Sequence, residues 1–284
     1  SFFSVRFSLI PLFLAKIFKK PIILGPRGEF SEGALSLKAF KKKLYIQLYK
    51  FLGLARGVVF QASSNFEFND IKKALGGHNK IFVAEDIGSQ EYAKDLVVKD
   101  NAVIKLVFIS RISPMKNLAY ALEVLKSVSS PVIFDIYGPQ EDAIYWNECE
   151  AIIKVLPERI VVHYKGLLKP SDVVDTLATY DLFFMPTKGE NYGHIIAEAL
   201  CAGLPILIAN TTPWRDLVNK GVGWDISLEE PGQFALAIEK ASAMSAESYQ
   251  EYRQNVLSWA KIKFSQPEAV NANKSMFKFA VENK

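Results

Sequence analysis

Short apolar runs alternate with longer amphipathic segments along most of the chain. The short runs are apolar at nearly every position, which favours β-strands covered on both faces. They lie at 21–24, 58–61, 80–83, 105–109, 132–137, 160–163, 182–185, 205–208 and 222–224. The amphipathic segments predict helices at 35–52, 65–75, 117–127, 140–155, 171–178, 193–202 and 213–220. This alternation predicts an α/β protein with doubly wound parallel sheets.

The alternation stops between Ala84 and Asn101, where charged residues, Gly88 and Ser89 replace the apolar runs. We therefore expect a domain boundary there, with a first domain at 1–97 and a second at 98–264. From Pro231 onward the sequence predicts three helices and no strand. Breaks near Ser245 and Gln266 separate these helices, and we expect the last segment, 265–284, to be a helix that returns to the first domain.

The first residues combine an apolar run with basic residues that follow it. The chain does not open with Met, and the run from Phe7 to Ala15 is far shorter than the ~20 residues that span a bilayer. A signal peptide would carry its basic residues before the apolar run, whereas Lys16, Lys19 and Lys20 come after it. We expect a helix here, in a domain whose beginning precedes Ser1.

Composition narrows the class of protein. Half of the 284 residues are hydrophobic (50%) and 23% are charged, which excludes intrinsic disorder as the main state. The two cysteines cannot form a disulfide scaffold, and no Cys/His cluster indicates structural zinc. We expect a cytoplasmic enzyme without a metal.

The net charge of +4 is unevenly distributed. Residues 1–80 carry 14 Lys and Arg against 4 Asp and Glu, a charge of +10, whereas the remainder carries −6. A basic first part favours contact with phosphates or with an anionic membrane surface. A solvated helix face around Lys41, Lys42 and Lys43 explains it equally well.

Polar residues gather after the predicted strands of the second domain. Arg111 follows the strand at 105–109, and Lys116 lies five residues further on. Because ligands of open parallel sheets bind beyond the carboxyl ends of the strands, we expect both cations at a ligand site. A guanidinium grips two phosphate oxygens and an ammonium adds a point charge, so the pair fits a diphosphate. The alternative is that both are ordinary surface charges.

The segment 190–200 is the most informative. Gly189 and Gly193 allow the backbone to pass close to a ligand, and the helix that follows presents free N–H groups and its positive end. Glu190 lies in the loop and Glu198 lies within the helix, so the two carboxylates can serve different parts of one ligand. A capping carboxylate and a solvated Glu are the structural alternative.

These residues resemble a retaining glycosyltransferase of the GT-B type, family 4 (glycosyl transferases group 1). Glu190 to Glu198 resembles the E-x7-E element, and it continues into Glu-Ala-Leu-Cys-Ala-Gly-Leu-Pro at 198–205. Segments 108–117, 136–139, 165–167 and 180–186 resemble further family elements in the family's order. The resemblance implies two Rossmann-like doubly wound domains that face a cleft, the first of them incomplete.

The resemblance also implies a role for each matching residue. Arg111, Lys116 and Glu190 would be catalytic, and Arg27 is a possible acceptor-side contact. Donor binding would involve Gly138, Gly166, Leu167, Asn191, Tyr192, Gly193, His194 and Glu198. The implied donor is a nucleotide-diphosphate sugar, no cofactor or metal is expected, and no nucleic acid is a partner. The acceptor would be a glycan or a lipid-linked molecule, with possible peripheral association at the inner membrane face.

Several points depart from the family pattern or stay open. Ser110 replaces the usual Gly before Arg111, and the early strands and glycine-rich loop of the acceptor domain have no counterpart, which suggests a truncated first domain. The chain could then bind nucleotide sugars without transferring them, and a GT-B-type epimerase is a third possibility. Arg27 could instead serve a structural turn, and Ser64 and Glu67 match a capping box.

Overall fold

The computed structural model describes residues 2–36, 38–88, 91–96 and 102–283. The chain divides into two compact units. The first comprises Ser1–Ile87, Glu190–Tyr192 and Gln266–Lys284, and the second comprises Gly88–Gly189 and Gly193–Ser265. The predicted boundary between Val97 and Val98 lies outside the described residues.

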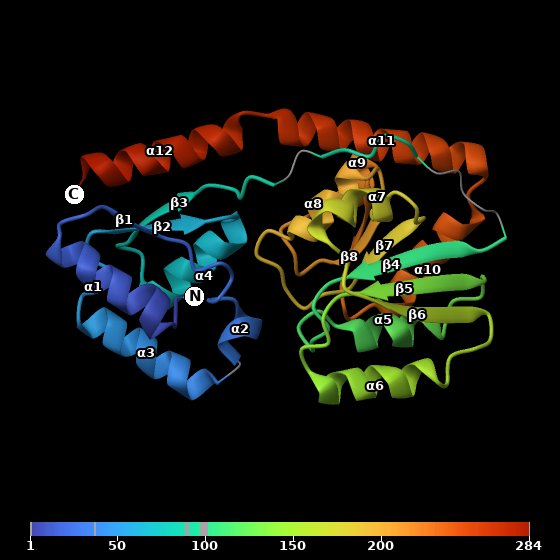
Figure 1. The fold of residues 1–284 in the computed structure, drawn as a ribbon, viewed down its shortest axis with the longest axis horizontal. Helices are drawn as coiled ribbons and strands as arrows, with labels where there is room; N and C mark the ends of the chain where they lie inside the picture. The colour runs from blue at the N-terminus through green and yellow to red at the C-terminus, as the bar shows by residue number, and fades with distance from the viewer. Residues whose placement is uncertain (1, 37, 89–90, 97–101, 284) are drawn as a thin grey trace. The chain divides into compact units, whose positions relative to one another are not determined.

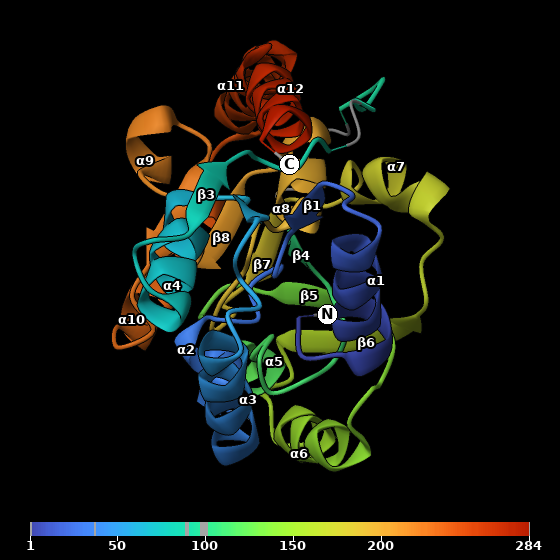
Figure 2. The same cartoon turned by 90° about the vertical axis from the view of Figure 1, so that its left-hand side faces the viewer.

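The first unit is built on a three-stranded parallel sheet of order β1-β2-β3. Its elements are η1 (Val5–Leu9, a short π-helix), α1 (Ile10–Ile17), β1 (Ile22–Leu24), α2 (Glu32–Ser36), α3 (Ala39–Phe51), β2 (Val58–Ala62), α4 (Asn65–Leu75), β3 (Lys80–Val83) and α12 (Glu268–Glu282). Helix α12 lies on one side of this sheet, and α1, α3 and α4 lie on the other (Figures 1 and 2). The apolar run at the start of the chain is helical, as predicted.

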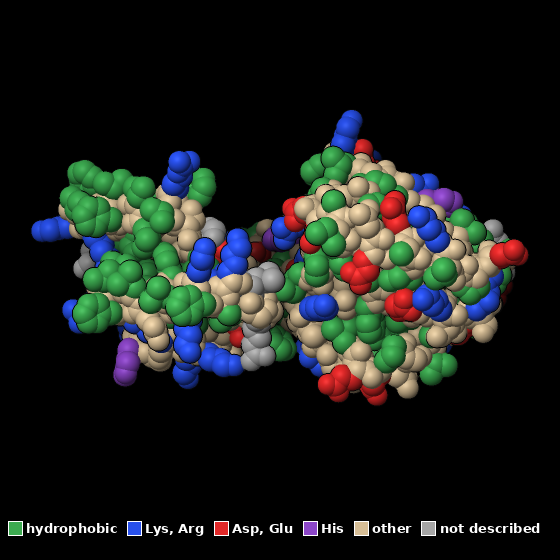
Figure 3. Space-filling model, turned by 90° about the horizontal axis from the view of Figure 1, so that it is seen from below, with side chains coloured by type: hydrophobic (Ala, Val, Ile, Leu, Met, Phe, Trp, Pro, Cys, Tyr) green, Lys and Arg blue, Asp and Glu red, His purple; other side chains and the backbone are tan. Residues whose placement is uncertain are grey.

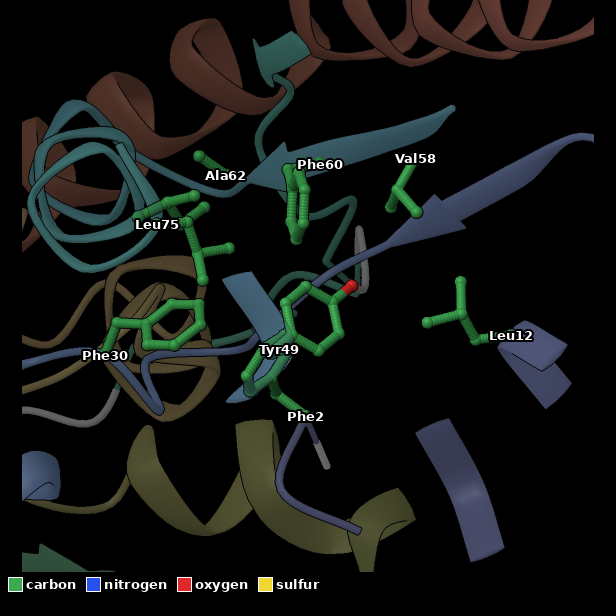
Figure 4. Close-up of a cluster of buried hydrophobic side chains, with 9 residues drawn as sticks. Phe2, Leu12, Phe30, Tyr49, Val58, Phe60, Ala62 and Leu75 are labelled. Atoms are coloured by element: carbon green, nitrogen blue, oxygen red, sulfur yellow. The ribbon is translucent and has the colours of Figure 1, made fainter. Parts of the chain in front are cut away.

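Two apolar clusters hold the first unit together, one on each face of its sheet. Phe60 is fully buried and packs with Tyr49 of α3 and Leu75 of α4 (Figure 4). On the opposite face, Val59 packs against Met276 of α12. Successive residues of β2 thus point to different clusters, which explains why the strand is apolar at every position except Gln61.

The second unit contains a six-stranded sheet in which all pairs are parallel, of order β6-β5-β4-β7-β8-β9. Its elements are β4 (Ile104–Ile109), α5 (Leu118–Leu125), β5 (Val132–Tyr137), α6 (Ala143–Ile153), β6 (Ile160–Gly166), η2 (Pro170–Asp172), α7 (Val173–Leu177), β7 (Leu182–Met185), α8 (His194–Cys201), β8 (Ile206–Ala209), α9 (Leu217–Lys220), β9 (Gly223–Ile226), α10 (Pro231–Ala243) and α11 (Ala246–Ser265). Helices α5, α6 and α10 lie on one side of this sheet, and α7, α8 and α11 lie on the other (Figure 1). The predicted α/β class with parallel, doubly wound sheets is confirmed.

Two predicted helices are interrupted or shortened by residues with a left-handed backbone. The segment 35–52 forms two helices, α2 and α3, because Lys38 has a left-handed backbone (φ 56°) directly before α3. The segment 213–220 is helical only in α9, because Asp216 is also left-handed (φ 61°) and its N–H group, like that of Leu217, is bound by Asp225. A residue with a left-handed backbone interrupts a helix, but the apolar residues on either side keep their helical spacing. The sequence pattern alone therefore does not reveal the break.

Helix α8 is fixed at its C-terminal end by a buried cation from α11. The Arg253 side chain is fully buried and donates to the carbonyls of Ala202 (3.2 Å) and Gly203 (3.1 Å), which follow the last turn of α8. It also donates to the Ala178 carbonyl (2.8 Å) beyond α7. A cation at this end complements the helix dipole. No helix in the described part of the chain is long and apolar enough to cross a membrane.

Candidate active site

The loops after β4 and β7 meet where the strand order of the second unit reverses. The Lys188 N–H donates to the Met115 carbonyl (2.9 Å), and the Asn117 side-chain amide donates to the Pro186 carbonyl (2.9 Å). Such a reversal point, at the carboxyl ends of parallel strands, is where open α/β sheets bind ligands. Lys116 lies between two residues that make these contacts, so the fold brings it to the expected edge.

Arg111 follows β4 at the same edge, with its side chain exposed. Its Nη1 forms an ion pair with a carboxylate oxygen of Glu141 (3.2 Å), a partner that the sequence analysis did not identify. An exposed pair of this kind contributes about 0–1 kcal/mol. A diphosphate that offers two charged oxygens can therefore displace Glu141 from the guanidinium.

Gly138 joins the loops after β4, β5 and β6. Its N–H donates to the Gly166 carbonyl (2.8 Å), and its φ of +132° lies in a region that side chains rarely adopt. A Cβ at this position would lie 1.9 Å from the Ser110 carbonyl oxygen. Only glycine permits this approach. Gly138 therefore sets the position of the backbone next to Arg111.

We expect Gly138→Ala to destabilise the protein by at least about 2 kcal/mol, because strain at a glycine-only conformation and overpacking each cost about 1–3 kcal/mol. Urea unfolding measures the difference. Gly232→Ala is the matched control: Gly232 lies in α10, and an added Cβ meets no atom within 4 Å. Alanine in a helix is favoured there by about 0.5–1 kcal/mol. Equal midpoints for the two variants would contradict the assignment.

The predicted base-contacting residues lie beside Gly138. Gly166 ends β6, and Leu167 follows it with a largely exposed side chain (74%). The Tyr164 hydroxyl donates to the Gly138 carbonyl (2.9 Å), which ties β6 to the same loop. These residues form one continuous edge with the loop that carries Arg111. Contact with a nucleotide base stays a prediction.

Helix α8 begins directly after Gly193, whose φ is +82°. Gly193 has no side chain to cap the helix, and its carbonyl accepts from the N–H groups of Ile196 (2.9 Å) and Ala197 (3.2 Å). The positive φ favours glycine at this tight entry, and a Cβ on Gly193 would also lie 2.9 Å from Ile196 Cδ1, which would then have to shift. His194 is the first helical residue, and its side chain is exposed. The end of α8 that attracts anions is thus left without a side-chain cap at its first residue.

Glu198 lies one helical turn into α8 and is half-buried. Burial raises the pKa of its carboxyl, and the nearby charge of Glu91 raises it further, whereas His194 acts in the opposite direction. The carboxylate is therefore less well solvated than that of a surface Glu, and a hydrogen-bond donor such as a hydroxyl stabilises it more. This environment is consistent with a binding role, which stays a prediction.

The segment Glu190–Tyr192 belongs to the first unit, although it precedes α8 directly in sequence. Tyr192 is buried and Glu190 is half-buried. The Asn191 side chain hydrogen-bonds to Ser63 and Glu67, which flank the start of α4. Sequence analysis placed these three residues with the donor-binding domain. The Ser-x-x-Glu pattern at 64–67 predicts only a local helix cap, so the link to Asn191 is not visible in the sequence.

Arg27 lies in a tight turn of the first unit. Both Arg27 and Gly28 have positive φ (56° and 78°), and the Glu29 N–H donates to the Pro26 carbonyl (3.3 Å). The Arg27 side chain forms an ion pair with Asp86 and is about half exposed. Sequence analysis gave Arg27 two possible roles, a structural turn and an acceptor-side contact, and the structure contains the turn. An acceptor contact stays a prediction.

The structure therefore brings together Arg111, Lys116, Gly138, Gly166 and Leu167 at one edge of the second unit. Glu190 and Asn191 belong to the other unit, so their approach to this edge stays a prediction. No group of three His, Cys, Asp or Glu residues within the described ranges is placed to hold a metal ion.

Comparison with known proteins decides the family. The family model for glycosyl transferases group 1 matches residues 90–259, more than half of the chain. The chain belongs to this family. Among curated proteins, the chain is similar to an uncharacterized 41.2 kDa protein in the cps region of Klebsiella pneumoniae. The two are 22% identical over 254 residues, an alignment that covers 86% of this chain and 67% of that protein.

Solved structures agree with the fold of this glycosyltransferase-family chain. Alr3699/HepE of Anabaena, solved in complex with UDP and glucose, superposes with a TM-score of 0.72 at 17% identity, over 95% of this chain and 74% of that one. Sucrose-phosphate synthase of Thermosynechococcus elongatus superposes with a TM-score of 0.76 at 12% identity, over 95% and 71%. At these identities the similarity shows the GT-B fold alone.

Proposed function

We propose that this chain transfers a sugar from a nucleotide-diphosphate sugar to an acceptor hydroxyl, with retention of configuration and without a metal ion, as a member of family 4. The observation that carries the proposal is the edge of the second unit where Arg111 and Lys116 follow β4, with the neighbours of Lys116 bonded to the loop after β7. Two cations at a strand-reversal point suit a diphosphate. Complexes of Alr3699/HepE with UDP and with UDP-glucose support the choice of ligand.

The proposed reaction breaks the bond between the anomeric carbon and the β-phosphate oxygen. The electron pair of that bond stays on the phosphate, and Arg111, Lys116 and the first N–H groups of α8 stabilise the charge. The acceptor oxygen attacks the same face of the sugar, and its proton passes to the leaving phosphate. A covalent intermediate would need a carboxylate beneath the anomeric carbon, and no residue of this chain is assigned to that role.

The remaining assigned residues bind and orient the donor. Glu190 contacts the transferred sugar, and Glu198 accepts hydrogen bonds from the ribose hydroxyls. The loops at Gly138 and Gly166 frame the base. The half-buried position of Glu198 on α8 supports its assignment, because a poorly solvated carboxylate gains from hydroxyl donors.

The acceptor side is proposed to involve the basic first part of the chain, at an anionic membrane surface that carries a lipid-linked acceptor. The first unit exposes large apolar side chains next to its lysines, among them Phe13 of α1 (64% exposed) and Phe40 of α3 (81%). Figure 3 shows hydrophobic and basic side chains intermingled on this unit. Flotation with anionic vesicles but not with neutral ones is the expected result. The cps-region relative supports a role in surface polysaccharide or glycoconjugate biosynthesis.

Titration calorimetry with UDP- and GDP-sugars, paired with a transfer assay, tests the proposal. We expect a nucleotide sugar to bind in the presence of EDTA and to be turned over with an acceptor, with product of retained configuration by NMR. Binding without turnover favours a nucleotide-sugar-binding protein instead. An epimerised sugar formed without acceptor favours an epimerase, and no binding of any nucleotide contradicts all three functions.

A further inference from the structure

Glu67 has a buried carboxylate that accepts more hydrogen bonds than a helix cap requires. It lies in the first turn of α4 and is 4% exposed. Its Oε2 accepts from the N–H (2.8 Å) and the hydroxyl (2.9 Å) of Ser63, and its Oε1 accepts from the N–H of Gly28 (2.7 Å). A buried carboxylate without such donors would be strongly destabilising.

Asn191 completes this set of donors. The hydrogen-bond network orients its side-chain amide so that the nitrogen donates to both oxygens of Glu67 (2.6 and 3.1 Å). In the same orientation the Asn191 nitrogen also lies within hydrogen-bond distance of the Ser63 hydroxyl oxygen (2.7 Å), which can accept from it while donating its own proton to Glu67. A Cβ on Gly28 would lie 3.2 Å from Asn191 Cβ, so the Gly28 turn and the Asn191 segment are also in close contact.

The predicted capping box does not account for this arrangement. In a capping box the Glu side chain bonds to the N-cap N–H, here that of Ser64. Within the described residues the structure shows the other half: the Ser64 hydroxyl accepts from the Glu67 N–H (3.2 Å) and caps α4. The Glu67 carboxylate instead joins two segments that are remote in sequence, the Gly28 turn and the Asn191 segment.

We infer that Glu67 is a positioning residue for sugar transfer, acting through Asn191 on the adjacent Glu190. The inference rests on the proposed function, in which Glu190 contacts the transferred sugar. Asn191 is joined to Glu190 by a peptide bond, so an Asn191 side chain held by two carboxylate oxygens restricts the backbone on which Glu190 stands. Glu67 itself touches neither donor nor acceptor in this proposal.

Two variants separate positioning from helix capping. Glu67→Gln keeps the size of the side chain but turns an acceptor into a donor that faces other donors. Ser64→Ala removes the cap of α4 and leaves the Glu67 carboxylate in place. Amide hydrogen exchange of the variants reports on the segment directly. We expect exchange in a peptide covering Glu190–Tyr192 to become at least 10-fold faster in Glu67→Gln and to stay within 2-fold in Ser64→Ala.

Kinetics provide the second readout. We expect Glu67→Gln to lower kcat at least 10-fold while the dissociation constant for the nucleotide alone changes less than 3-fold, and Ser64→Ala to leave kcat unchanged. In Glu67→Gln/Asn191→Ala the loss should not exceed that of the larger single variant, because both changes remove one contact. Should Glu67→Gln fail to fold, Asn191→Ala removes the same contact from its other partner.

Unchanged exchange at Glu190–Tyr192 in Glu67→Gln, or equal acceleration in Ser64→Ala, overturns the inference. Fully multiplicative losses of kcat in the double variant overturn it as well. A wild-type chain that shows no transfer contradicts the proposed function instead. The exchange measurement then still decides whether Glu67 holds the segment.

Discussion

Replacing Arg111 or Lys116 with Ala is expected to lower turnover at least about 100-fold, equivalent to about 2.7 kcal/mol of transition-state stabilisation. In the proposed reaction the leaving β-phosphate gains negative charge as its bond to the sugar breaks, and each cation would stabilise that charge more than the charge of the bound donor. The Arg111 variant should fold normally, because its partner Glu141 is itself partly exposed and becomes solvated when the guanidinium is removed.

Steady-state kinetics with a saturating acceptor measure this effect. Arg111→Lys keeps the charge and loses the planar fork, so its activity should fall between those of the wild type and Arg111→Ala. Lys126→Ala is the control: Lys126 forms an exposed ion pair with Glu123 in the same unit (2.7 Å) and has no proposed role in transfer. Near-normal kcat in both alanine variants would remove Arg111 and Lys116 from the mechanism.

Arg253→Met is expected to destabilise the second unit by about 3 kcal/mol or more. The substitution leaves three carbonyls, those of Ala178, Ala202 and Gly203, without the donor that now binds them. Each buried polar group that loses its partner costs about 1–3 kcal/mol. Because two of these carbonyls follow the end of α8, its anchoring to α11 weakens along with the stability.

Urea unfolding of the variants provides the measurement. Arg159→Met is the matched control, because Arg159 also donates to two carbonyls, those of Val128 (2.7 Å) and Lys126 (3.3 Å), but its side chain is exposed. The bond from Arg159 to the Lys126 carbonyl is exposed, so water can replace the guanidinium there, and the loss of Arg159 should cost less than the loss of Arg253. Equal losses in the free energy of unfolding for the two variants would show that burial of the guanidinium does not explain the contribution of Arg253 to stability.

Much of the second unit's edge could be predicted from the sequence. Parallel strands covered on both faces are apolar at nearly every position, so runs such as 132–137 and 182–185 identify β5 and β7 to the residue. Polar residues that follow them must lie at the carboxyl ends, which is how Arg111 and Gly138 reach the same edge. The roles assigned to Glu190, Glu198 and Arg27 came from the family resemblance and stay predictions.

The tertiary structure alone decided which partners the charged groups have. Nothing near Arg111 in sequence marks Glu141 as its partner, and the spacing of Ser64 and Glu67 predicts a local cap rather than bonds to Gly28 and Asn191. The periodicity of a sequence reports which face of an element is buried, because burial repeats with the helix or strand. A hydrogen bond between distant segments has no period, so it becomes visible only when the folded chain places its donor and acceptor together.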